Sequence, residues 1–187
     1  MANGLCFVIT GPSGSGKTTV VEKLLERLPS AARLDTTTTR APREGEQDGV
    51  DYHFLSREEF IARRERGEFL EWAENYGNLY GSSKVELEKL RASRDVVFAI
   101  VDTKGATAYR EFVPDAVLVM LVAPIEQLKA RLLRRKQVSD AELARRMAEA
   151  EAEMAFAPRC HHTVECFDGK LCLAADKIAS FIAERRS

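Results

Sequence analysis

Apolar runs bounded by polar residues recur along the chain. They lie at Leu5–Thr10, Asp95–Asp102 and Ala116–Val122, and a last strand is expected near Thr163–Phe167. Continuous apolar runs of this length are typical of parallel strands that are buried on both faces. The pattern therefore predicts a central parallel sheet.

Helical periodicity fills the segments between these runs. Lys17–Leu28 places its apolar residues on one stripe, as an amphipathic helix does. Gly105–Glu111 lies between two predicted strands and would complete a parallel crossover unit. Further helices are predicted at Ile125–Arg135, at Asp140–Glu153, which is rich in good helix formers, and from about Leu171 to Arg185. Strands and helices thus alternate, as in an α/β fold.

The segment 35–83 has a different residue pattern. β-Branched residues, glycine turns and aromatic residues recur there at short intervals, which predicts short strands and hairpins. One helix is expected over Ser56–Gly67, because Ser56 and Glu59 form the pattern of a capping box. We interpret the segment as an insertion on the α/β core rather than an independent domain.

Composition fits a single globular domain over 1–187. Of the residues, 45% are hydrophobic and 30% charged, and the net charge of −1 gives no basic field for nucleic acid. No apolar run is long enough to cross a bilayer, and the opening residues MANGLCFVIT lack the features of a signal peptide. We expect a cytoplasmic protein that binds neither nucleic acid nor a membrane.

The four cysteines include no C-x-x-C pair. The neighbours Cys160, His161 and His162 suggest a metal site, but a tetrahedral zinc site needs a further ligand group at a suitable spacing. Reduced, unpaired thiols are the favoured interpretation.

A phosphate-binding loop follows the first predicted strand. Gly11–Thr18 reads GPSGSGKT and satisfies G-x-x-x-x-G-K-[ST], in which backbone N–H groups and the start of a helix surround phosphate oxygens. Lys17 would neutralise the β- and γ-phosphates, and the Thr18 hydroxyl would ligate Mg²⁺. Asp102, at the end of the next buried strand, either helps to hold the metal or is an ordinary polar residue at a strand end. The sequence therefore predicts nucleotide binding.

Two uses of a bound nucleotide are disfavoured. A GTP switch needs a base-reading N/T-K-x-D element, and TVECFD at Thr163–Asp168 does not supply one. A mechanical ATPase is expected to end a strand in paired acids, whereas Val101–Thr103 contains one acid only. Phosphoryl transfer to an acceptor remains.

The insertion carries residues suited to an anionic acceptor. Arg40 and Arg43 flank a proline-stiffened turn, a geometry that clamps an anion. Tyr52 and Tyr80 would donate to phosphate oxygens or stack beside a base. Glu71, expected on a partly shielded strand, would accept two hydrogen bonds from the guanine N1–H and N2–H₂ groups. Each residue alone fits a solvated surface, but together they indicate a second substrate site.

From about Leu5 to Ile182 the sequence resembles the guanylate kinases. The matching blocks are GPSGSGKTT, TTTTRAPREGEQDGVDYHF, EFLEWAENYGNLYGSS and Arg131–Met147. The resemblance implies a P-loop kinase fold with a central parallel sheet, a core (1–34, 84–125 and 154–187), a mixed α/β monophosphate-binding insert (35–83) and a helical lid (126–153). It also implies Mg²⁺-dependent phosphoryl transfer from ATP to GMP or dGMP.

The resemblance also implies roles for single residues. Lys17, Arg40, Arg135 and Arg146 are implied to stabilise the transferring phosphoryl group, with Arg131 as a weaker lid candidate. Thr18 and Asp102 are implied as metal ligands. The implied ATP-binding residues are Gly11, Pro12, Ser13, Gly14, Ser15, Gly16, Lys17, Thr18 and Thr19. The implied GMP-binding residues are Thr36, Arg40, Arg43, Tyr52, Glu71, Tyr80 and Ser82.

The chain departs from the family pattern in two places. Ile100 and Lys104 stand where the family has an acid and a glutamine, and Cys166–Gly169 replaces an Asn-Asp-Asp run near the adenine. Two alternatives therefore remain: a P-loop kinase with another acceptor, such as a different nucleoside monophosphate or ribose 1,5-bisphosphate, and a non-catalytic interaction module. The sequence is compatible with a monomer or a homodimer.

Overall fold

The computed structural model describes residues 3–75, 77–135, 139–167 and 171–186. Its central sheet has five parallel strands in the order β2-β7-β1-β8-β9. These strands are β1 (Leu5–Thr10), β2 (Ala31–Arg33), β7 (Val96–Ile100), β8 (Val117–Val122) and β9 (His162–Glu165). The predicted α/β fold with a central parallel sheet is confirmed.

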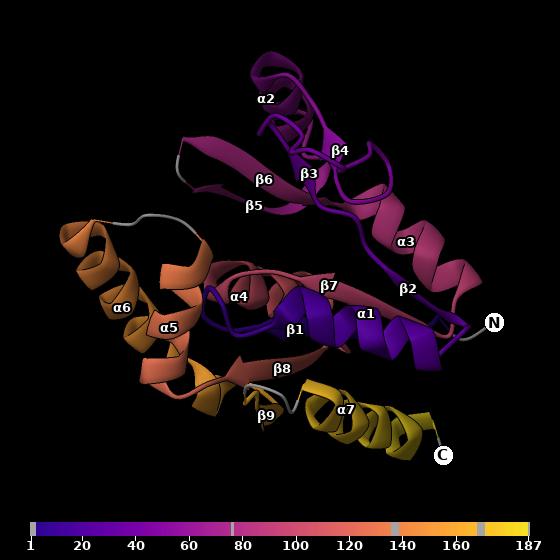
Figure 1. Cartoon of the computed structure of the whole chain (residues 1–187). Helices are drawn as coiled ribbons and strands as arrows, with labels where there is room; N and C mark the ends of the chain where they lie inside the picture. The colour runs from indigo at the N-terminus through magenta and orange to yellow at the C-terminus, as the bar shows by residue number, and fades with distance from the viewer. Residues whose placement is uncertain (1–2, 76, 136–138, 168–170, 187) are drawn as a thin grey trace.

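Helices cover both faces of this sheet (Figure 1). On one face lie α1 (Lys17–Arg27) and α7 (Leu171–Arg186), which share an apolar cluster with Phe7 and Ile9 of β1. On the other face lie α3 (Lys84–Ser93) and α4 (Thr103–Phe112), which pack on Cys6 and Val8 of β1. Successive β1 residues thus enter opposite cores, because side chains alternate along a strand. This explains why β1 has no polar face.

A second, mixed sheet lies apart from the central one (Figure 1). Its strands are β3 (Thr37–Thr38), β4 (His53–Phe54), β5 (Phe69–Asn75) and β6 (Asn78–Ser83), in the order β4-β3-β6-β5. Helix α2 (Arg57–Glu65) covers it through Phe60, whose ring stacks on Phe69 with centroids 4.4 Å apart. Ser56 caps this helix by accepting a hydrogen bond from the Glu59 backbone N–H at 3.1 Å. The hairpin and the helix predicted for 35–83 are present.

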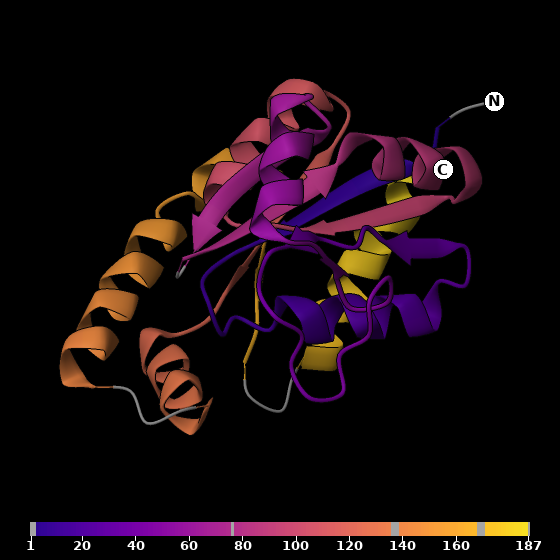
Figure 2. The same cartoon turned by 90° about the horizontal axis from the view of Figure 1, so that it is seen from above.

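Two further helices follow β8 and lie side by side in both views (Figures 1 and 2). They are α5 (Ile125–Arg135) and α6 (Asp140–Met154), joined by an apolar cluster that includes Leu128 and Ala150. A short 3₁₀ helix (Ala157–Arg159) leads from α6 into β9. Both chain ends lie at the opposite end of the molecule from this helix pair.

The buried cysteines and two neighbouring histidines of the described residues make packing or hydrogen-bond contacts. All four cysteines are free, and Cys6 and Cys166 are buried. His161 accepts a hydrogen bond from the Leu118 backbone N–H at 2.9 Å, and the His162 ring stacks on Phe181. Within the described ranges, no group of three His, Cys, Asp or Glu residues could hold a metal ion, and no helix combines the length and apolarity needed to cross a membrane.

Candidate active site

The phosphate loop connects the carboxyl end of β1 to the start of α1. All three of its glycines, Gly11, Gly14 and Gly16, have the positive φ that favours glycine. Gly11 has φ 138°, and a Cβ there would lie 2.2 Å from the Leu121 carbonyl oxygen. Gly16 has φ 94° and caps α1 without a side chain. The first N–H groups of α1 therefore face the loop, which is the geometry that binds phosphate at a helix N-terminus.

Lys17 lies folded against the loop. Its Nζ donates to the carbonyl oxygens of Gly11 at 2.6 Å and Pro12 at 3.1 Å. Thr18 is exposed in the first turn of α1. Arg131 of α5 donates to the carbonyl oxygens of Gly14 at 2.8 Å and Cys166 at 2.9 Å. The weaker lid candidate thus contacts the phosphate loop directly.

Asp102 follows β7 and caps α4. Its Oδ1 accepts a hydrogen bond from the Gly105 backbone N–H at 2.8 Å. Glu153 of α6 lies at the phosphate loop: burial raises its pKa, whereas the charge of Lys17 and a hydrogen bond with the Ser13 backbone lower it. Lys17 and Asp102 follow the carboxyl ends of β1 and β7, where ligands bind in open α/β sheets, and Glu153 lies near the same loop. The pattern of the sequence alone does not reveal Glu153, because it lies on the polar surface of a helix far along the chain.

Arg40, Tyr52 and Tyr80 form one cluster in the second sheet. The two tyrosine rings meet edge to face with centroids 6.5 Å apart, and Arg40 Cζ lies 5.2 Å from the centre of the Tyr52 ring. The Arg43 side chain is exposed nearby. A guanidinium and two tyrosine rings thus lie together, a set of groups that can bind a phosphate.

Glu46 holds the Arg40 guanidinium. Both Glu46 carboxylate oxygens accept from Arg40 Nη2 at 2.9 Å, and Oε2 also accepts from the Arg43 backbone N–H at 2.8 Å. Sequence reasoning missed Glu46. The signal that was present is an acid three residues after Arg43, in a turn with two arginines.

Glu71 and Ser82 face each other across β5 and β6. Ser82 is 2% exposed, and its hydroxyl donates to Glu71 Oε1 at 2.7 Å. Burial raises the pKa of Glu71 to about 7, the Ser82 hydrogen bond lowers it, and Asp102 raises it. Thr36 directly precedes β3, the strand that pairs with β6. The structure therefore brings the predicted guanine-binding residues together on neighbouring strands.

The remaining residues singled out by the sequence lie outside these groups. Arg146 of α6 donates through Nε to Glu142 Oε1 at 2.7 Å, within its own helix. Arg135 ends α5, and its side chain lies outside the described residues, as does the whole of Asp168. Ile100 ends β7 and packs on the apolar cluster under α1, whereas Lys104 is exposed on α4.

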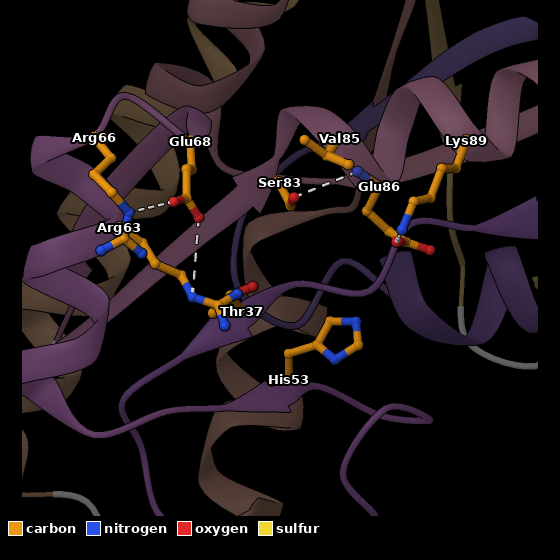
Figure 3. A pocket seen from close by; sticks show the side chains of 9 residues that line it. All are labelled: Thr37, His53, Arg63, Arg66, Glu68, Ser83, Val85, Glu86 and Lys89. Atoms are coloured by element: carbon orange, nitrogen blue, oxygen red, sulfur yellow. Dashed lines mark hydrogen bonds and ion pairs between the residues drawn. The ribbon is translucent and has the colours of Figure 1, made fainter.

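A pocket of about 480 Å³ lies between α2 and α3 (Figure 3). Its lining includes Thr37 and Ser83, which follow Thr36 and Ser82 along their strands and so point to the opposite face of the sheet. Its cations turn toward its carboxylates, as the pairs Arg66–Glu68 at 2.5 Å and Lys89–Glu86 at 3.9 Å show. None of the predicted site residues lines this pocket.

Known proteins resemble the chain along nearly all of its length. The guanylate kinase family model matches residues 4–182. Guanylate kinases of Aromatoleum aromaticum and Idiomarina loihiensis are 48% and 47% identical, each over 81% of this chain and over 74% and 73% of their own lengths.

Solved structures agree with the sequence relatives. The guanylate kinase from Anaplasma phagocytophilum superposes with a TM-score of 0.79 at 27% identity, covering 99% of this chain and 87% of that one. A shikimate kinase from Acinetobacter baumannii shares the fold alone, with a TM-score of 0.52 at 20% identity over 97% of this chain and 94% of that one. The chain belongs to the guanylate kinase family.

Proposed function

We propose that the protein transfers the γ-phosphoryl group of ATP to GMP or dGMP, giving ADP and GDP or dGDP, with Mg²⁺ as cofactor. The observation that carries this proposal is the Glu71–Ser82 pair beside an intact phosphate loop, in a chain that matches the guanylate kinase family from residue 4 to residue 182. A carboxylate paired with a hydroxyl matches the donor and acceptor edge of guanine.

The phosphate loop, Gly11–Thr19, holds the triphosphate of ATP. Its backbone N–H groups bind and orient the phosphates and form no covalent bond with them. Lys17 leaves the loop carbonyls to reach the β- and γ-phosphate oxygens. Thr18 and Asp102 present the oxygen donors that Mg²⁺ prefers, directly or through water. When bound, Mg²⁺ neutralises charge on the β- and γ-phosphates.

The insert 35–83 holds the acceptor. Arg40, Arg43, Tyr52 and Tyr80 bind the GMP phosphate, and Glu71 reads the guanine edge with Thr36 and Ser82 beside it. The GMP phosphate is already an anion at neutral pH, so the reaction needs no general base. Catalysis is then alignment of the two phosphates and stabilisation of their charge.

The helix pair over 126–153 acts as a lid. Its arginines, Arg135 and Arg146, move toward the transferring phosphoryl group, where their charge offsets the approach of two anions. Closure also expels water from the site, which limits hydrolysis of ATP.

An ADP-release assay tests the proposal. ATP is supplied with GMP, dGMP, AMP, CMP, UMP or ribose 1,5-bisphosphate, each at the same concentration. GMP or dGMP should give the highest kcat/KM. Preference for another acceptor would assign the chain to a kinase of different specificity, and absence of ADP release with every acceptor would favour a non-catalytic module.

A further inference from the structure

Tyr109 of α4 carries a hydroxyl that the fold leaves without a partner. The side chain is 0% exposed, and its Oη makes no hydrogen bond of normal geometry with any described residue. A buried hydroxyl without a partner destabilises a protein, and phenylalanine would fill nearly the same space. The hydroxyl therefore needs an explanation other than packing.

The surroundings of Tyr109 point to the guanine site. Gly105 lies one helical turn earlier, on the same face of α4. A Cβ on Gly105 would lie 3.2 Å from Glu71 Oε2, so this face of α4 is packed directly against the guanine-reading carboxylate. Burial and the nearby Cys6 raise the pKa of Tyr109, the close approach of the Ser82 hydroxyl lowers it, and Glu71 raises it, although Ser82 and Tyr109 do not meet in hydrogen-bond geometry. The orphan hydroxyl thus faces the Glu71–Ser82 pair from behind.

Ser82 has one proton to give. In the structure that proton is donated to Glu71 Oε1, at 2.7 Å. A guanine base offers two donors, N1–H and N2–H₂, and these require both oxygens of Glu71. These donors compete with Ser82 for the lone pairs of Glu71, so the Ser82 hydroxyl can exchange Glu71 for another acceptor, and its own lone pairs are open to a new donor.

We propose that Tyr109 is a positioning residue of the guanine site: its hydroxyl donates to Ser82 Oγ in the GMP complex and thereby directs the Ser82 proton toward guanine O6. This inference rests on the proposed function. The hydrogen-bond chain Tyr109–Ser82–guanine is complete only with the base bound, so the buried hydroxyl destabilises the free enzyme and stabilises the complex. Such an exchange of stability for function is common at binding sites.

The variant Tyr109→Phe separates these two effects. The KM for GMP should rise about threefold to tenfold, the effect of one neutral hydrogen bond, with kcat and the KM for ATP unchanged. Without GMP the Tm of the variant should equal or exceed that of the wild type. At a fixed GMP concentration the ligand-induced rise in Tm should be smaller than in the wild type.

Two further variants make the test specific. Val113→Ala removes packing at the end of α4 in the same apolar cluster, and it should lower Tm without changing the KM for GMP. Ser82→Ala should abolish the effect of Tyr109→Phe in the double variant, since the hydroxyl acts only through Ser82.

The inference fails separately from the proposed function. Wild-type activity on GMP together with an unchanged KM in Tyr109→Phe would overturn the inference alone. A lower Tm or failure to fold in Tyr109→Phe would also overturn it, because the hydroxyl would then be structural. Additive effects of Ser82→Ala and Tyr109→Phe would exclude action through Ser82. A wild type that does not phosphorylate GMP would overturn the proposed function and this inference with it.

Discussion

Glu71 is partly buried, yet the guanine recognition proposed for it requires a charged carboxylate. Guanine offers donors, so an ionised carboxylate is the best reader, yet burial raises the pKa of Glu71 to about 7. The Ser82 hydroxyl offsets part of this penalty by donating to Oε1. If Glu71 reads guanine as proposed, its ionisation near pH 7 should control acceptor binding.

Replacing Glu71 by glutamine should weaken GMP and leave ATP unaffected. The amide places a donor where guanine also offers one, so each lost charge-assisted hydrogen bond should cost about 1.5–3 kcal/mol of GMP binding. Steady-state kinetics with each substrate varied in turn measure this effect. An equal rise of both KM values would identify Glu71 as a structural residue.

The same carboxylate predicts a pH dependence. As the pH falls below about 7, Glu71 takes up a proton and kcat/KM for GMP should fall, because this ratio reports the free enzyme. Glu71→Gln should lack that part of the profile and retain only the titration of the GMP phosphate. A wild-type profile that matches that of the variant would contradict the assignment.

Stability should change in the opposite direction. The folded-state pKa of Glu71 is raised from 4.5, so the folded protein binds the proton more tightly than the unfolded chain. The free energy of unfolding should therefore fall by about 3 kcal/mol through this group as the pH rises from 4.5 to 7, and stay level above. Denaturant unfolding at pH 5 and pH 8 measures the change in the free energy of unfolding between these pH values, which should be larger in the wild type than in Glu71→Gln.

Under the proposed function, Glu46 should act on the acceptor phosphate through Arg40. It holds the guanidinium with both oxygens and orders the turn through the Arg43 N–H. Glu46→Gln should raise the KM for GMP several-fold, because Arg40 loses its fixed orientation. The matched control is Glu59→Gln, which breaks an exposed ion pair with Arg63 on α2 in the same insert and should have little effect. A lower KM in Glu46→Gln would instead show that Glu46 competes with the GMP phosphate for Arg40.

At the scale of elements, the sequence pattern predicts the observed strands and helices best where burial determines which residues are apolar. Strands β1, β7 and β8 are predicted because both of their faces are covered, which leaves unbroken apolar runs. Strand β2 and helix α3 are not predicted. β2 is three partly buried residues, and α3 buries only Leu87, so neither carries a readable periodicity. Helix α4 begins at Thr103 rather than Gly105, because Asp102 caps it.

The residues of the candidate site likewise fall into two groups, those that the sequence indicates and those that only the structure reveals. The phosphate loop, Arg40 and Glu71 are singled out by their residue types and spacing, whereas Ser82 is assigned only by the resemblance to the family. Glu153 and Tyr109 cannot be predicted, because their relevance comes from contacts between segments far apart in the chain.

Helix α5 is tied to the phosphate loop by Arg131. Its guanidinium bridges the carbonyl oxygens of Gly14 and Cys166, a contact that needs a planar fork. Arg131→Lys keeps the charge and loses the fork, so it should raise the KM for ATP more than the KM for GMP. The two KM values measured on the purified variant decide this, and a rise confined to GMP would place Arg131 outside the donor site.

At the scale of the whole molecule, three parts meet at the carboxyl ends of the central strands. The phosphate loop belongs to the core, the Glu71–Ser82 pair to the second sheet, and Arg146 to the helix pair (Figure 1). In the structure, Lys17 contacts loop carbonyls and Arg146 pairs with Glu142. In the proposed mechanism both cations leave these partners to reach the transferring phosphoryl group, so we expect the parts to move together during catalysis.

This coupled movement predicts strong dependence of ATP turnover on the acceptor. With ATP and Mg²⁺ alone, ADP release should be slow, because the helix pair does not close on an empty acceptor site and Arg146 stays with Glu142. GMP should accelerate it by orders of magnitude. Arg146→Ala should lower kcat with GMP and leave the slow background unchanged, since the arginine takes part only after closure. Rapid ADP release without GMP, or a background that falls in Arg146→Ala, would mean that Arg146 already contacts the phosphates before the acceptor binds.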